Sequence, residues 1–136
     1  TEGYGPNNLG FNNLISNGAK IIFTVDCGTL SFGPINFAQK LNVDVIVLDH
    51  HQSDVKLPEA CAIVNPNRYD DTSELNYLCA AGVCFVFLVA LNKKLRDENW
   101  FKNNKFTFIS SIPKIIGKFT DDEKLFKKQF EYFLNR

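Results

Sequence analysis

The chain has 136 residues, 45% of them hydrophobic and 22% charged, with a formal net charge of zero at pH 7. Such a chain can bury a core as one globular domain, which excludes an intrinsically disordered protein as the default. No apolar run reaches the roughly 20 residues that span a bilayer, and residues 1–4 lack a basic or apolar signal segment, so we expect a cytoplasmic protein with no membrane partner.

Charge is distributed unevenly along the chain. Residues 1–92 contain 4 basic and 9 acidic residues, whereas residues 93–136 contain 11 basic and 6 acidic residues. The acidic first part suits metal binding better than direct phosphate binding, and the basic second part can attract nucleic-acid phosphates. A solvated helix face explains the same basic residues, so both interpretations stay open from the sequence.

The first 48 residues alternate between helical and strand patterns. Two runs are apolar and β-branched without polar alternation, which is typical of strands buried on both faces of a parallel sheet. Asparagines before the first helical pattern and a glycine after it supply a cap and a stop. The expected elements are a helix from residue 7 or 8 to 17, a strand over 21–25, a helix from Pro34 to about Leu41, and a strand over 43–48.

The next part of the chain predicts a third strand and a long helix. Residues 61–64 form the short strand, residues 68–74 a polar loop, and residues 75–95 a largely buried helix. Arg68 in the loop can clamp a phosphate or simply be solvated. Strands that alternate with helices favour an α/β fold with a parallel sheet flanked by helices, in which ligand sites gather outside the carboxyl ends of the strands.

The four cysteines show no CxxC spacing. They lie in apolar segments, where a free cysteine behaves as a small buried hydrophobe. We therefore expect reduced thiols in the core at Cys27, Cys61, Cys79 and Cys84.

Two polar segments fall at predicted strand ends. Asp26 follows the first strand, and Asp49-His50-His51, which contains both histidines of the chain, follows the second. Carboxylate and imidazole together suit Mn²⁺, Fe²⁺ or Zn²⁺ better than Ca²⁺. Two metals about 3.5–4 Å apart can activate water for phosphodiester hydrolysis if a carboxylate bridges them, and Asp26 is the candidate bridge. A turn with surface histidines is the alternative interpretation.

Five short segments strengthen the metal-site interpretation because they occur in a defined order. Residues 24–28 (TVDCG) are followed, 23 residues after Asp26, by Asp49-His50-His51, and then by residues 64–67 (VNPN). The segments 2–5 (EGYG) and 78–83 (LCAAGV) flank them. Together they resemble RecJ-type single-stranded-DNA exonucleases of the DHH phosphoesterase superfamily. The resemblance covers residues 1–101 as a partial DHH phosphoesterase domain, and residues 102–136 form a divergent Phe/Lys-rich tail with an expected C-terminal helix.

This resemblance implies 5′-to-3′ hydrolysis of single-stranded DNA with Mn²⁺ or Mg²⁺. Carried onto this sequence, Asp26 bridges two metals and His50 coordinates one of them. Asp49 then orients His50, and His51 faces the scissile phosphate. Gly82 is either a point where the backbone approaches a phosphate or a site of close helix packing.

The resemblance is incomplete, because the family also carries an earlier strand end with paired aspartates and a later metal-binding aspartate. Asp121 and Asp122 lie where they suit the N-terminus of a helix rather than a metal. We therefore expect the chain alone to bind metal weakly and to have little nuclease activity. Whether an adjacent polypeptide supplies the missing motifs stays open from the sequence. The alternatives are a DHH-family phosphoesterase for short oligonucleotides or pyrophosphate, and a noncatalytic remnant or partner-binding module.

Overall fold

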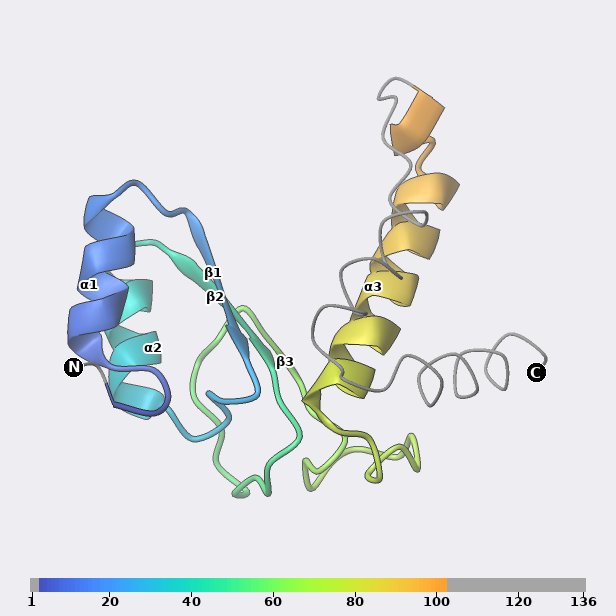
Figure 1. Cartoon of the computed structure of the whole chain (residues 1–136), viewed down its shortest axis with the longest axis horizontal. Coiled ribbons are helices and arrows are strands. Elements are labelled where there is room, and N and C mark those ends of the chain that lie inside the picture. The colour runs from blue at the N-terminus through green and yellow to red at the C-terminus, as the bar shows by residue number, and fades with distance from the viewer. Residues whose placement is uncertain (1–2, 103–136) are drawn as a thin grey trace. The chain divides into compact units, whose positions relative to one another are not determined.

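A computed structural model describes residues 3–102 and contains a three-stranded parallel sheet with helices (Figure 1). The chain divides into two compact units, Thr1–Leu88 and Val89–Arg136, and the sheet lies in the first. The predicted α/β fold with a parallel sheet flanked by helices is confirmed. The elements are α1 (Asn8–Ser16), β1 (Ile21–Val25), α2 (Phe32–Lys40), β2 (Asp44–Leu48), β3 (Ala62–Val64), α3 (Ala80–Asp97) and the 3-10 helix η1 (Trp100–Lys102).

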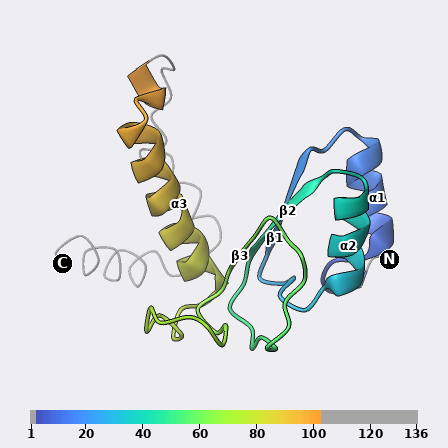
Figure 2. The same cartoon turned by 180° about the vertical axis from the view of Figure 1, so that it is seen from behind.

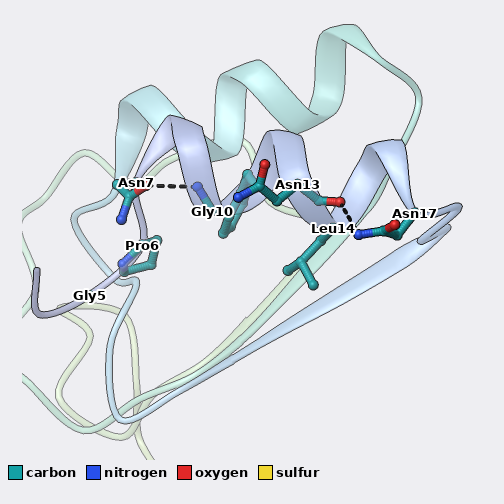
Figure 3. A pocket seen from close by; sticks show the side chains of 8 residues that line it. Gly5, Pro6, Asn7, Gly10, Asn13, Leu14 and Asn17 are labelled. Carbon is teal, nitrogen blue, oxygen red and sulfur yellow. Dashed lines mark hydrogen bonds between the residues drawn. The ribbon is translucent and has the colours of Figure 1, made fainter. Parts of the chain in front are cut away.

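Helix α1 begins and ends on asparagine side chains, as Figure 3 shows. The side chain of Asn7 accepts a hydrogen bond from the Gly10 N–H at 2.8 Å, which satisfies one of the free donors of the first turn. At the other end, the Asn17 side-chain amide donates to the Asn13 carbonyl at 2.9 Å. Gly18 follows with a φ of 90°, the left-handed conformation that stops a helix. A shallow pocket of about 310 Å³ lies along this helix.

The three strands run in the order β1-β2-β3, with both neighbouring pairs parallel. Val25 lies opposite Leu48, and Leu48 lies opposite Val64, so the three carboxyl ends are level. Helices α1 and α2 lie together on one side of the strands in both views (Figures 1 and 2). The core between them consists of Phe11, Ile22, Ile35, Ala38, Val43, Val45 and Val47.

Strands β1 and β2 differ in burial, which corrects one expectation. The adjacent residues Val47 and Leu48 of β2 are both buried, as expected for a strand covered on both faces. In β1, however, Ile21, Phe23 and Val25 are each about half exposed, at 52%, 50% and 51%. Successive side chains of a strand point to opposite faces, and these three point away from α1 and α2. The prediction that this strand is buried on both faces is therefore wrong.

Helix α3 begins at Ala80, five residues later than the sequence pattern indicated. Glu74 has a φ of 57°, and the Leu78 N–H donates to the Leu75 carbonyl at 3.0 Å, so a turn occupies the preceding residues. Towards the end of the helix, two lysines pair with acidic residues four positions later. These pairs, Lys93–Asp97 at 2.6 Å and Lys94–Glu98 at 2.8 Å, are typical of a solvated helix face.

All four cysteines are free, as predicted, but two of them are not in a core. Cys61 and Cys79 are exposed, and Cys27 and Cys84 are partly buried, so the expectation of core thiols is wrong for the first two. No helix within residues 3–102 is long and apolar enough to cross a bilayer. The helix predicted near the C-terminus, over residues 122–134, lies outside the described residues.

Candidate metal centre

Asp26 directly follows β1 and has an uncommon backbone conformation. Its φ of 61° lies in the left-handed region, which aspartate adopts more readily than most residues but still at a cost. The Asp26 N–H donates to the Leu48 carbonyl at 3.0 Å, and the Tyr4 hydroxyl donates to the Asp26 carbonyl at 2.8 Å. The main chain is thus held on both sides, while the carboxylate remains 54% exposed.

The turn after Asp26 requires a glycine. Gly28 has a φ of 114°, a conformation that L side chains rarely adopt. A Cβ atom at this position would lie 2.5 Å from Thr24 Oγ1 and 3.2 Å from Val47 Cγ1. The absence of a side chain lets the turn pack closely against the ends of β1 and β2, which brings Asp26 beside the residues that follow β2.

His50 is the residue that meets the Asp26 carboxylate. Its Nε2 atom lies 3.2 Å from Asp26 Oδ1. The ring of His51 is next to it, with 4.7 Å between the ring centroids. One ligand atom from each of Asp26, His50 and His51 can be chosen so that all three lie within 4.8 Å of one another. Two neighbouring strand ends therefore bring together three side chains of types that can ligate a metal.

Asp49 lies behind this cluster and is almost completely buried, with 1% exposure. Its Oδ2 atom accepts from the N–H and the hydroxyl of Thr29, at 3.1 and 2.7 Å. Its Oδ1 atom accepts from the N–H groups of His50 and His51, at 2.8 and 3.3 Å. Burial alone would raise the pKa of Asp49, but hydrogen bonds from Thr29, His51 and His50 together lower it to about 2. The carboxylate is therefore ionised at neutral pH and acts only as an acceptor.

The ring of His51 is oriented by Asp49. His51 Nδ1 lies 2.7 Å from Asp49 Oδ1, and because the ionised carboxylate can only accept, Nδ1 must carry a proton. This leaves Nε2 of His51 as the ring atom that can meet a ligand. The hydrogen bond and the charge of Asp49 raise the pKa of His51, and the charge of Asp26 adds to this effect.

This geometry differs from the predicted pairing within the Asp49-His50-His51 segment. The resemblance implied that Asp49 orients the ring of His50. In the structure, the Asp49 carboxylate contacts the His51 ring and reaches His50 only through its backbone N–H. The physical reason is local: the main chain turns immediately after β2, so the side chain two positions later, not the adjacent one, folds back over the carboxylate.

Two further residues complete the polar network, and sequence reasoning gave neither of them a role. Thr29 is 2% exposed and Asn65 is 3% exposed. The Asn65 amide donates to Thr29 Oγ1 and to the His51 carbonyl, both at 2.8 Å. Asn65 therefore connects the segments that follow β1, β2 and β3. The motif at residues 64–67 contains Asn65, but the sequence indicated only a family resemblance for it and no hydrogen-bonding role.

Gly82 and Arg68 have contacts that favour structural roles. A Cβ atom on Gly82 would lie 3.0 Å from Leu78 Cδ2, which agrees with close packing in the first turn of α3. Its phosphate-binding role stays a prediction. Arg68 donates to the Ile63 carbonyl at 2.7 Å and forms an ion pair with Asp70, so its guanidinium holds the end of β3 to the following loop. The guanidinium is partly buried, and its two partners, the Ile63 carbonyl and Asp70, are both groups of this chain.

The three clustered side chains fit a divalent transition metal. Imidazole nitrogen and carboxylate oxygen are the donors that Mn²⁺, Fe²⁺ and Zn²⁺ accept, and the exposed Asp26 carboxylate leaves the cluster open to solvent. The pocket along α1 shares none of these residues. A parallel α/β sheet with an Asp-His-His cluster outside its strand ends defines a protein class, namely α/β proteins with a strand-end metal site.

Sequence comparison places the chain in a known family. The profile of the DHH family, N-terminal domain, matches residues 2–110. This range covers most of the chain, and the chain belongs to the DHH family.

Three relatives are RecJ exonucleases. The chain is 39% identical over 100 residues to the single-stranded-DNA-specific exonuclease RecJ of Escherichia coli, which covers 74% of this chain and 17% of that protein. It is 38% identical over 97 residues to RecJ of Bacillus subtilis, which covers 71% of this chain and 12% of that protein. A crystal structure of exonuclease RecJ bound to manganese superposes with a TM-score of 0.59 at 31% identity, over 69% of this chain and 23% of that one. The predicted resemblance to RecJ is confirmed, and the chain spans less than a fifth of these two curated relatives.

Proposed function

We propose that this chain supplies part of the metal centre of a RecJ-type exonuclease that hydrolyses single-stranded DNA in the 5′-to-3′ direction with Mn²⁺ or Mg²⁺. The observation that carries the proposal is the approach of His50 Nε2 to Asp26 Oδ1, 3.2 Å apart, with His51 within the same cluster. These are two different donor types from two adjacent strand ends. The manganese bound to a RecJ relative of the same fold supports the choice of metal.

The proposed roles follow from the contacts of each side chain. Asp26 and His50 would hold the metal, because Asp26 Oδ1 and His50 Nε2 face each other across 3.2 Å. Asp49 holds Nδ1 of His51, so the Nε2 atom of His51 would face the scissile phosphate or the attacking water. Asp49 fixes the His51 ring by accepting from Nδ1. A bound metal would supply Lewis-acid activation of water and neutralise charge on the phosphodiester.

The described residues offer fewer ligands than two metals need, so we propose that another polypeptide segment completes the site. Among the strands of residues 3–102, β1 lies at an edge of the sheet, which supports this proposal. Asp26 N–H pairs with Leu48, and Lys20 carbonyl pairs with Asp44, so the even-numbered backbone groups of β1 face β2. Because alternate residues of a parallel strand face opposite edges, Ile21, Phe23 and Val25 direct their backbone groups to the edge away from β2. An added parallel strand could pair there and bring carboxylates beside Asp26.

A binding measurement tests the metal centre in this chain. Mn²⁺ affinity would be measured for the purified 136-residue chain by electron paramagnetic resonance of free Mn²⁺. Asp26→Asn should weaken binding at least about tenfold, as removal of an ionised ligand usually does. Asp44→Asn is the matched control, because Asp44 is also an exposed aspartate but lies at the opposite end of β2. Equal affinities of the two variants would contradict the proposed site.

A chimera tests the proposed activity in the context of a complete enzyme. The 100 matching residues of the Escherichia coli relative would be replaced by those of this chain. The chimera should degrade single-stranded DNA with Mn²⁺, and His50→Ala within it should abolish that activity. A chimera that folds but cleaves pyrophosphate or short oligonucleotides instead would favour the alternative phosphoesterase. A folded chimera with no hydrolysis of any of these substrates would favour a noncatalytic module.

The isolated chain provides the complementary result. We expect it to release few or no nucleotides from single-stranded DNA, because its ligand set is short. Robust Mn²⁺-dependent release by the isolated chain, abolished by His50→Ala, would show that no further polypeptide is needed.

A further inference from the structure

The main chain of the two histidines is held in a way that the metal cluster alone does not explain. The N–H groups of His50 and His51 donate to Asp49 Oδ1. Their carbonyl oxygens accept from two side-chain amides: Asn67 Nδ2 lies 2.5 Å from the His50 carbonyl, and Asn65 Nδ2 lies 2.8 Å from the His51 carbonyl. All four polar main-chain groups of this dipeptide are therefore bonded to side chains.

The two asparagines are themselves fixed by their surroundings. Asn65 Oδ1 accepts from the main-chain N–H of Asn67 at 2.8 Å, so the Asn65 side chain holds the Asn67 main chain. Asn65 also donates to Thr29 Oγ1, which in turn donates to Asp49. The main-chain carbonyl of Asn67 accepts from the Ser53 hydroxyl at 3.1 Å. The Asn65 amide is thus oriented by Thr29, and the Asn67 main chain is held by Asn65 and Ser53, which places the Asn67 amide at the His50 carbonyl without a bound ligand.

The rings of the two histidines differ in how they are oriented. His51 has Asp49 as the partner of its Nδ1 atom. His50 meets Asp26, the other proposed ligand, and the ring of His51. In the described part of the chain, the carboxylate that meets the His50 ring is Asp26, which is exposed and is itself a proposed ligand, unlike the buried Asp49 behind His51. The direction of its ring therefore depends on the position of its main chain, which the Asn67 amide holds at the carbonyl.

We propose that Asn67 and Asn65 are positioning residues that set the main chain of His50 and His51, and thereby the direction in which the His50 ring meets a metal. This inference rests on the proposed metal centre, in which Asp26 and His50 hold the metal and His51 lies beside them. Neither amide contacts a ligand atom, so both act through the histidines. Holding the ligand before binding reduces the ordering cost of binding, which is how groups behind a metal ligand normally affect affinity.

The experiment compares Asn67→Ala with Asn17→Ala in the full 136-residue chain. Asn17 is a matched control because its side-chain amide also donates to a main-chain carbonyl, that of Asn13, but on α1. The readout is the NMR signal of the histidine rings, which is simple because the chain has two histidines, and His51→Gln assigns them. In metal-free protein, Asn67→Ala should move the His50 ring signal towards that of free histidine, whereas Asn17→Ala should leave it unchanged.

A second measurement on the same variants links the inference to metal binding. Mn²⁺ titration, followed by paramagnetic broadening of the His50 signal, should show roughly tenfold weaker binding for Asn67→Ala and no change for Asn17→Ala. A wild-type chain that binds no Mn²⁺ would contradict the proposed metal centre, while the metal-free signal of His50 would still decide whether Asn67 orders the ring.

Two outcomes would overturn the positioning role. One is a His50 ring signal in folded Asn67→Ala that is the same as in the wild type. The other is an equal change in Asn17→Ala, which would indicate a general loss of stability. Circular dichroism establishes that each variant is folded. Asn65→Ala removes a buried side chain, and its larger expected loss of stability makes Asn67→Ala the deciding variant.

Discussion

Two aspartates at neighbouring strand ends of one sheet have opposite environments. The Asp49 side chain is 2% exposed and accepts five hydrogen bonds, whereas the Asp26 side chain is 54% exposed and faces His50. Both oxygens of the Asp49 carboxylate accept hydrogen bonds from protein groups, whereas the Asp26 carboxylate faces mostly outwards. The comparison separates a carboxylate that builds the site from one that is available to a ligand.

The largest expected effect that sharpens this comparison is on stability. Asp49→Ala should lower the free energy of unfolding by about 4 kcal/mol, because it leaves several buried donors without an acceptor. Asp26→Asn, which keeps a residue type that tolerates the positive φ at this position, should lower it by less than about 0.5 kcal/mol, as substitutions of exposed groups usually do. Urea unfolding of both variants measures the difference. Similar losses for the two would show that the environments are not distinct.

The turn between the two carboxylates gives the next largest effect. Gly28→Ala should cost about 3 kcal/mol, since an alanine at a positive φ is strained and its Cβ would contact Thr24. Gly33→Ala is the control, because Gly33 lies in α2 with only Asn8 Oδ1 near its would-be Cβ, at 4.0 Å. It should be neutral or stabilising by up to about 1 kcal/mol. A well-tolerated Gly28→Ala in thermal unfolding would mean that the turn can relax.

Acid should weaken the buried half of the site selectively. The pKa of Asp49 is lowered from 3.8 to about 2, so its contribution is complete above pH 4 and is lost as the pH falls through 2. The expected loss is on the order of 2 kcal/mol. Urea unfolding of metal-free protein between pH 2 and pH 7 measures it, and Asp49→Asn should lack this part of the pH dependence. His51 behaves oppositely: its raised pKa stabilises the fold at low pH, and this is lost as the pH rises through that pKa.

The two strands provide the smallest contrast. Val47→Thr should cost about 1.5 kcal/mol, because a hydroxyl would be buried in the core. Val25→Thr has the same shape change on a half-exposed face and should cost less than about 0.5 kcal/mol. Chemical unfolding of both variants tests whether the outer face of β1 is open to solvent. A loss of 1.5 kcal/mol at Val25 as well would indicate that this face is covered.

Much of the fold could be predicted from local sequence patterns. The β-branched runs marked β1 and β2, and the helix cap at Asn7 followed from its side-chain chemistry. The burial of β1 could not be predicted in the same way. An apolar run shows that a strand can be buried on both faces. Whether its side chains are buried depends on which other elements pack over each face of the strand.

The candidate site shows a similar division between what the sequence reveals and what it does not. Parallel strands predicted that Asp26 and His50 converge, because their carboxyl ends meet at one edge. The partner of each side chain was harder to predict, since the pairing of Asp49 with His51 depends on a turn of the main chain after β2. Thr29 and Asn65 were missed because hydrogen bonds between distant loops leave no local periodicity in the sequence.

The level ends of the three strands determine where the chain can accept an inserted residue. Asp26, Asp49 and Asn65 each come one residue after a strand, and the ladder aligns Val25, Leu48 and Val64. A residue inserted within β2 would shift the following side chains by about 3.3 Å and turn them to the other face. A residue inserted in the exposed loop between β2 and β3 would leave the alignment intact. Mutational scanning by single-residue insertion should therefore outline the ladder as a sharply intolerant region beside a permissive loop.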